Sequence, residues 1–369
     1  MKNTAPPFPA NCQTTAMGIM PHTDIERALQ LCLGMDIPFW PQLPNVSFYE
    51  DMYVQASEHF PGMRVNPDLG ILTFNTALFR EEVAGDYTSN LENPDIFSLS
   101  RKYSAVYHRF LELDLSSHAA IRGQIIGPVS FGFRVNDQDR RPIIYDDEVR
   151  TILFDFILRK ANAQYRELRE RNPNAFVWLD EPGLGWLFSG MSGYGDIQAR
   201  ADYETLLAQI EGPRGLHLCA SINLPYLLEL GVDVLSFDAY QLEGMPRAYA
   251  EAAGAFMLKG GIICWGIVPT EPEGQGKEVP ESLTGKITRY WGTIAEATGL
   301  PPEQIARQSL VAPARCMLKN TGRVGAAGES GNQPSTGGRS SDLSIEEELV
   351  ETGFRYTIQV SRMLKERYL

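Results

Sequence analysis

The segment Gly215-Leu216-His217-Leu218-Cys219 is a short, largely apolar run, which is the pattern of a strand buried in a parallel sheet. Seven similar runs occur along the chain, and longer segments with a helical pattern separate most of them. The eight runs are residues 14–18, 69–74, 122–126, 175–179, 215–219, 233–237, 261–266 and 308–312. The clearest helical segments are residues 146–171, 196–211, 245–258, 280–298 and 345–368. This alternation predicts an α/β fold with a parallel sheet.

Eight strand–helix units in one chain predict a closed (β/α)8 barrel, the TIM barrel, formed by a single domain over residues 1–369. An open, doubly wound sheet is the alternative. In a barrel the active site lies at the carboxyl ends of the strands, on the loops that follow them. Polar residues directly after the predicted strands are therefore the candidates for function.

The composition is that of an ordinary folded protein. Hydrophobic residues make up 43% and charged residues 21% of the chain, which is enough apolar material for a continuous core. The formal net charge is −13 and no long Lys/Arg run occurs, so we expect no nucleic-acid partner. No stretch approaches the roughly 20 apolar residues of a membrane span, and the N-terminus lacks a signal-peptide pattern. We expect a cytoplasmic protein without a membrane partner.

Five cysteines, at positions 12, 32, 219, 264 and 316, form an odd and scattered set. Secreted disulfide frameworks are dense and even-numbered, so this set fits a reducing compartment. Cys12 precedes a strand, Cys32 lies in a helical pattern and Cys264 lies within a strand. We interpret these three as packing residues.

Residues 321–341 are rich in glycine and serine and hold too little apolar surface to order themselves. They predict a mobile loop near the C-terminus. Two roles stay open for this loop: a neutral surface insertion, or a lid over an occupied site, because it follows the strand end that carries Cys316.

Three soft metal ligands follow two of the predicted strands. A spacing of two residues puts His217 and Cys219 on the same face of an extended segment, where a barrel interior would receive both. Cys316 follows the eighth strand and arrives at the same end. Each residue alone is also typical of core packing, but imidazole with two thiolates favours zinc. Asp238 follows the sixth strand and is either the oxygen ligand of this zinc or a loop-stabilising carboxylate.

These ligand types suit one kind of chemistry. Zinc held by two thiolates and a carboxylate carries net negative charge, so a substrate thiol that displaces the carboxylate stays electron-rich as a bound thiolate. The predicted site therefore favours alkyl transfer to sulfur.

Further candidates follow the first, third and fourth predicted strands. Asp180 and Glu181 are the predicted catalytic carboxylates, of which one could bind a substrate ammonium group; a solvated turn is the alternative. Gly18 and the turn from Gly127 to Ser130 are small enough for backbone amides to approach a substrate carboxylate.

Five motifs carry a resemblance to a known family. They are Thr14-Thr15-Ala16-Met17-Gly18-Ile19-Met20-Pro21, Ile126-Gly127-Pro128-Val129-Ser130, Leu179-Asp180-Glu181-Pro182, His217-Leu218-Cys219 and Pro313-Ala314-Arg315-Cys316-Met317-Leu318-Lys319. In their order and placement they span nearly the whole chain. The chain resembles the catalytic domain of cobalamin-independent methionine synthase, within the superfamily that also holds uroporphyrinogen decarboxylase and the corrinoid-dependent methyltransferases.

The resemblance implies a (β/α)8 barrel whose zinc, held by a His, two Cys and a Glu, binds the sulfur of homocysteine. His217, Cys219 and Cys316 would be three of these ligands. Asp238 stands in the place of the glutamate, one methylene shorter, and Glu243 is the alternative. Asp180 would match the aspartate that binds the amino group of the substrate.

Two departures from the family concern the amino-acid end of the substrate. Ile19, which with Gly18 is predicted to contact the substrate, stands where the family usually has a serine, so a hydroxyl expected near the substrate carboxylate is missing. The family's His-Gly-Glu-Pro segment has no convincing equivalent around residues 44–61.

The resemblance leaves the methyl donor and the acceptor open. Because no amino-terminal partner domain is present, the chain resembles the short core enzymes, and we expect methylcobalamin or a corrinoid protein as donor, with methyl-tetrahydrofolate as the alternative. Coenzyme M is the alternative thiol. A non-catalytic module that binds zinc or a corrinoid protein is the alternative of another class, and the oligomeric state stays open.

Overall fold

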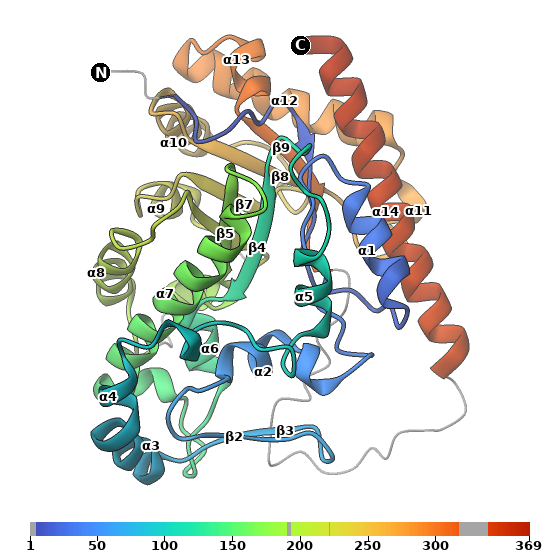
Figure 1. Cartoon of the computed structure of the whole chain (residues 1–369). Coiled ribbons are helices and arrows are strands. Elements are labelled where there is room, and N and C mark those ends of the chain that lie inside the picture. Colours follow the sequence, from blue (N-terminus) through green and yellow to red (C-terminus); the bar gives the residue numbers. More distant parts are fainter. Residues whose placement is uncertain (1–4, 190–192, 221, 317–338) are drawn as a thin grey trace.

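The computed structural model describes residues 5–189, 193–220, 222–316 and 339–369 of the chain. Its centre is a curled, seven-stranded parallel sheet with helices packed around it (Figure 1). The strands lie in the order β1-β9-β8-β7-β6-β5-β4. Their bounds are β1 (Gln13–Thr14), β4 (Ile121–Ile126), β5 (Ala175–Asp180), β6 (Arg214–Leu218), β7 (Val234–Asp238), β8 (Ile262–Val268) and β9 (Ser309–Pro313).

The predicted closed barrel of eight strands is not confirmed, because the main sheet in the described part of the chain has seven strands. The prediction that residues 69–74 form one of its strands is wrong. They contain β3 (Ile71–Phe74), which pairs antiparallel with β2 (Met63–Asn66) in a separate hairpin. Gly70, with a φ of +62°, lies in the turn between these two strands. An apolar run predicts a strand but does not identify the strand's partner, which explains the error.

Residues 37–42 contact both edges of the sheet without forming a regular strand. The amide of Ile37 donates to the carbonyl of Thr14 at 2.9 Å, and the amide of Arg122 donates to the carbonyl of Pro38 at 2.9 Å. Isolated hydrogen bonds of this kind therefore connect the β1 edge and the β4 edge to the same segment.

The predicted long helices are present, and several of their ends differ from the predicted ones. The helices are α1 (Ile25–Leu33), α2 (Met52–Ser57), α3 (Thr76–Glu82), α4 (Thr88–Asn90), α5 (Ala105–Leu111), α6 (Pro128–Arg134), α7 (Asp147–Arg169), α8 (Asp196–Leu207), α9 (Leu224–Leu228), α10 (Arg247–Leu258), α11 (Pro272–Lys277), α12 (Pro280–Thr298), α13 (Pro302–Arg307) and α14 (Arg339–Tyr368). Helix α12 has the predicted bounds, because Pro280 fits the first helical position and Gly299 follows the end with a φ of +76°. Within the described residues, no helix is long and apolar enough to cross a membrane.

Helix α14 begins inside the predicted loop 321–341. Residues 339–341 are helical, and residues 321–338 of that prediction lie outside the described part of the chain.

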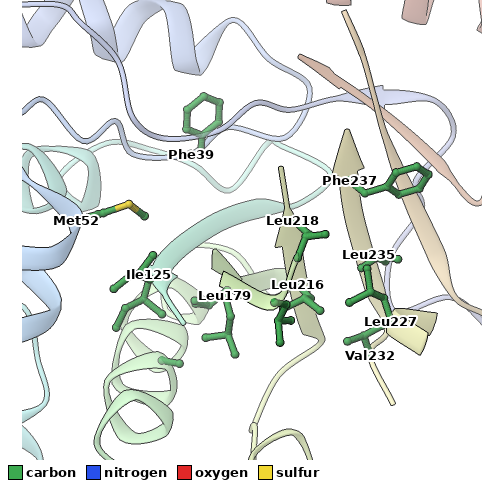
Figure 2. Close-up of a cluster of buried hydrophobic side chains, with 14 of the residues drawn as sticks. Phe39, Met52, Ile125, Leu179, Leu216, Leu218, Leu227, Val232, Leu235 and Phe237 are labelled. Carbon is green, nitrogen blue, oxygen red and sulfur yellow. The ribbon is translucent and has the colours of Figure 1, made fainter. Parts of the chain in front are cut away.

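The strand register places three polar side chains in one row inside the curl of the sheet. Asp180 on β5 pairs with His217 on β6, and His217 pairs with Ser236 on β7. Because side chains alternate along a strand, the adjacent residues face the other way, into a buried hydrophobic cluster. Figure 2 shows members of this cluster, including Leu179, Leu216, Leu218, Leu235 and Phe237. The apolar residues thus hold the sheet against its helices and leave the polar row on the inner face.

Candidate functional site

His217 is the best-defined member of the polar row. Its side chain is buried, its ring stacks on the ring of Trp178 with centroids 5.6 Å apart, and its Nδ1 lies 2.9 Å from the Ser236 hydroxyl. Its Nε2 has no hydrogen-bond partner among the described residues. Burial, together with the charge of Arg122, lowers the pKa of His217 to about 3. The imidazole is therefore neutral and carries one nitrogen that is free to bind a metal or a ligand.

Cys219 and Cys316 are both partly exposed and are electrostatic neighbours. Burial, together with the carboxylate of Asp180, raises the pKa of Cys219 to about 11, although the charge of Arg315 opposes this. Burial also raises the pKa of Cys316 well above its usual value, with Cys219 and Asp180 adding to the effect. Both thiols are therefore neutral at neutral pH unless a cation compensates the thiolate charge.

The donor types at this end of the sheet fit zinc. One imidazole nitrogen without a partner and two thiols are donors that zinc prefers, and the Ser236 hydroxyl orients the imidazole as expected for a metal ligand. Across the described ranges, however, no group of three or more His, Cys, Asp or Glu side chains lies close enough together to hold a metal ion. The sequence prediction of the zinc ligands therefore stays a prediction.

Asp238, the predicted fourth ligand, is engaged in an ion pair. The Nε of Arg315 donates to its Oδ2 at 2.5 Å, and the amide of Gln241 donates to its Oδ1 at 3.1 Å. Burial raises the pKa of Asp238, whereas Arg315 lowers it. The alternative ligand, Glu243, is an exposed residue of the loop after β7. This geometry does not test whether Asp238 or Glu243 is a zinc ligand. A metal would have to compete with Arg315 for the Asp238 carboxylate.

Asp180 is almost completely buried, and its Oδ1 has no hydrogen-bond partner in the described structure. Burial raises the pKa of Asp180 to about 7, the nearby charge of Arg122 lowers it, and Glu181 raises it. A cationic group that approaches this oxygen would favour the ionised carboxylate. The side chain is thus suited to bind an ammonium group, and this role of Asp180 stays a prediction.

Glu181 has a structural role at the start of helix α6. Its Oε1 accepts the amide of Val129 at 3.0 Å and the hydroxyl of Tyr203, and its Oε2 accepts the amide of Ser130 at 2.8 Å and the Ser130 hydroxyl at 2.5 Å. A Cβ on Gly127 would lie 2.1 Å from the carboxylate. Glu181 thus already accepts the amides of Val129 and Ser130. The predicted substrate-binding roles of Gly127 and Ser130, and the predicted catalytic role of Glu181, stay predictions.

Gly18 and Ile19 pack against neighbouring segments. A Cβ on Gly18 would lie 2.4 Å from the side-chain nitrogen of Gln124, so a larger residue here would displace the Gln124 amide. Ile19 is buried and forms a bridge to Gln42. Their predicted contact with a substrate carboxylate is not tested by these contacts.

Arg122 is a residue of the inner face that the sequence analysis missed. Its guanidinium is fully buried, donates to the carbonyl of Ala16, and lies 3.8 Å from the ring centroid of Trp178 and 4.8 Å from that of Phe39. Burial lowers the pKa of Arg122 to about 9, while Asp180 raises it. The signal that could have identified it is an arginine inside an otherwise apolar strand run.

A cavity of about 400 Å³ opens beside the carboxyl ends of β7, β8 and β9. Asp238 and Arg315 line it, together with Tyr240, Glu271 and Lys277. Its volume lies in the range of small-molecule sites. A small ligand therefore has room beside the Arg315–Asp238 pair.

Comparison with known proteins bears on the fold. No protein family model matches the chain, and no curated protein sequence matches it. A methyltransferase structure from Methanosarcina mazei aligns with a TM-score of 0.49 at 12% identity, covering 95% of this chain and 94% of its own. A B12-independent methionine synthase from Shewanella sp. W3-18-1, in complex with selenomethionine, aligns with a TM-score of 0.52 at 11% identity, covering 96% of this chain and 98% of its own. At the level of the fold this confirms the resemblance carried by the motifs: the chain has the fold of a B12-independent methionine synthase.

Proposed function

We propose that the chain is a methyltransferase that methylates the sulfur of a small thiol, with homocysteine as the acceptor and methionine as the product. The observation that carries the proposal is the free Nε2 of His217 together with the partly exposed thiols of Cys219 and Cys316 at the carboxyl end of the sheet. Transfer of a methyl group to sulfur needs a thiolate, and this donor set is one that generates a thiolate on a bound metal. The fold shared with a methionine synthase supports the same class of reaction.

In this proposal His217, Cys219 and Cys316 hold Zn²⁺, and Asp238 or Glu243 supplies an oxygen ligand. Bound zinc would lower the pKa of the substrate thiol, so that the thiol reacts as a thiolate. Arg315 would have to release Asp238 before that carboxylate could bind the metal, because its Nε occupies Oδ2.

The chain's own residues position the reactants. The Trp178 ring and the Ser236 hydroxyl fix the plane of the His217 imidazole. The free Oδ1 of Asp180 would accept a hydrogen bond from the substrate ammonium group. Burial of Asp180 excludes water and strengthens this interaction, which fixes the substrate relative to the two thiols.

The donor and the acceptor each have an alternative. The sequence predicts methylcobalamin or a corrinoid protein as donor, whereas the structural match is to a B12-independent enzyme, so methyl-tetrahydrofolate enters the test on equal terms. Coenzyme M is the alternative acceptor.

Metal analysis tests the ligand assignment. We expect the purified chain to bind about one zinc ion per molecule, as is usual for a single three-residue catalytic site. Cys219→Ser and Cys316→Ser should each weaken zinc binding by at least tenfold in a competition with a chelator, since each removes one thiolate. Cys32→Ala is the matched control, because Cys32 is buried in α1 and should leave zinc affinity unchanged. A wild-type chain without stoichiometric metal would contradict the assignment.

Turnover is tested with the zinc-loaded chain, a methyl donor and a thiol. Methylcobalamin and methyl-tetrahydrofolate are each combined with homocysteine or coenzyme M, and the methylated product is measured by mass spectrometry. We expect methionine from at least one donor and no product after zinc removal. Zinc binding without product from any combination would favour a non-catalytic binding module.

A further inference from the structure

A small cavity of about 20 Å³ lies between residues 37–42, α2, β4 and α7. All the residues that line it are buried, and none of the predicted site residues is among them. Three polar atoms of its lining residues have no hydrogen-bond partner in the described structure: Nε1 of Trp40 and the Oε1 atoms of Gln42 and Gln164.

The amine of Lys160 also belongs to the wall of this cavity. Lys160 is 4% exposed, and its Nζ forms no hydrogen bond or ion pair with any residue that the structure describes. Its Nζ lies 5.4 Å from the centroid of the Phe156 ring. The cavity is thus lined by residues with two unused donors, on Trp40 and Lys160, and two unused acceptors, on Gln42 and Gln164. Buried polar groups of this kind are costly unless a ligand satisfies them.

The hydrogen bonds of the two carboxamides fix which of their atoms stay unpaired. Gln42 donates from Nε2 to Oε1 of Gln55 at 2.7 Å, and Gln55 donates from its own Nε2 to the Glu50 carboxylate at 3.1 Å. Gln164 donates from Nε2 to the carbonyl of Gln124 at 3.3 Å. A flip of either the Gln42 or the Gln164 amide would place two acceptors face to face. Both amides therefore keep an oxygen available to a ligand.

Charge and size decide which ligand fits these four groups. The two fixed oxygens disfavour an anion, and the buried amine of Lys160 disfavours a cation. A cavity of about 20 Å³ has room for one water molecule, which needs about 10–15 Å³. Water accepts two hydrogen bonds and donates two, which matches the two donors and the two acceptors of the wall.

We propose that this cavity is a binding site for one ordered water molecule. The water accepts hydrogen bonds from Trp40 and Lys160 and donates to the side-chain oxygens of Gln42 and Gln164. It thereby joins residues 37–42 to α7, and it satisfies polar groups that the protein leaves unpaired. The site does not depend on methyl transfer.

The water would complete the contact between residues 37–42 and β4. The amide of Arg122 on β4 donates to the carbonyl of Pro38, which is a backbone contact. Two residues further along β4, the side chain of Gln124 donates to the carbonyl of Trp40 at 2.8 Å instead. Gln164 in turn bonds the backbone of Gln124. The bound water extends these side-chain contacts to α7, so it holds residues 37–42 against the sheet.

A crystal structure of the wild-type chain, at a resolution that shows ordered waters, tests the site. We expect one water peak within about 2.7–3.2 Å of at least three of the four groups. A second crystal is soaked in bromide, whose anomalous signal distinguishes a halide from water. No peak in the cavity, a peak with fewer than three of these partners, or an anomalous bromide signal there would overturn the proposal.

A variant tests the assigned hydrogen bonds. Gln164→Met removes one acceptor with little change in side-chain volume, so its crystal structure should lack the water. Its urea midpoint should fall, because other buried groups of the wall then lose their partner. Gln209→Met, at an exposed glutamine after α8, is the matched control and should keep both the water and the wild-type midpoint. A water that stays in place in Gln164→Met would overturn the role of Gln164 as its acceptor.

Discussion

At the scale of single residues, burial sets the charge of the groups in the candidate site. It lowers the pKa of His217 to about 3, raises that of Asp180 to about 7 and raises that of Cys219 to about 11. These shifts favour the neutral form of each group. A dication is the agent that would turn the two thiols into thiolates, which is why the proposal joins this site to zinc.

Lys160 on α7 provides a pH test away from the candidate site. It is buried, and burial lowers its pKa to about 8, although Glu58 and Glu167 raise it. The unfolded chain keeps this proton up to about pH 10.4. Between pH 8 and 10 the unfolded state therefore binds more protons than the folded state, so stability rises with pH in this window. We expect wild type to gain about 2 kcal/mol of unfolding free energy relative to Lys160→Met from pH 8 to pH 10.

Urea unfolding of both chains at several pH values measures this difference. The comparison with Lys160→Met cancels the titration of groups that the two chains share. Lys277→Met, which removes an exposed lysine paired with Glu273, should run parallel to wild type. Parallel curves for Lys160→Met would mean that Lys160 stays charged in the folded chain.

At the scale of elements, helix α6 depends on a residue of another strand end. The N-cap residue Gly127 has no side chain that could accept the first amides of α6, and Glu181, which follows β5, accepts those of Val129 and Ser130 instead. The same helix presents Phe131 to Tyr53. The start of α6 thus depends on a carboxylate from another strand end.

Removal of the Glu181 carboxylate should destabilise the fold. Glu181→Ala leaves two buried amides and the Tyr203 hydroxyl without an acceptor, so we expect a loss of about 3 kcal/mol or more in unfolding free energy. Urea denaturation checks this value. Glu204→Ala on the exposed face of α8 should cost less than about 0.5 kcal/mol. A similarly small effect at Glu181 would show that the network is not needed for the fold.

At the scale of the whole molecule, the apolar runs of the sequence predicted most strands of the main sheet. Strands β4 to β9 lie close to the apolar runs, since strands buried on both faces read as continuous hydrophobic segments. The hairpin that contains residues 69–74 was assigned to the wrong sheet because pairing depends on distant residues. The segment 37–42 was not predicted at all, because its isolated hydrogen bonds leave no periodic pattern.

The sequence could predict those parts of the candidate site whose position depends only on the order and direction of the strands. Asp180, His217 and Cys219 lie at or directly after the carboxyl ends of neighbouring parallel strands, so their common location follows from the fold. The Arg315–Asp238 pair joins residues 77 positions apart, and the capping role of Glu181 needs the three-dimensional position of α6. Such contacts between distant residues have no signature in a single sequence.

Thiol activation at zinc is the central claim, and proton release tests it most directly. The zinc-loaded chain is titrated with homocysteine in weakly buffered solution at neutral pH, and the released protons are counted against bound thiol. We predict about one proton per homocysteine bound, because the thiol binds as a thiolate, and none with the zinc-free chain. Homocysteine that binds the zinc-loaded chain without releasing a proton would contradict the account.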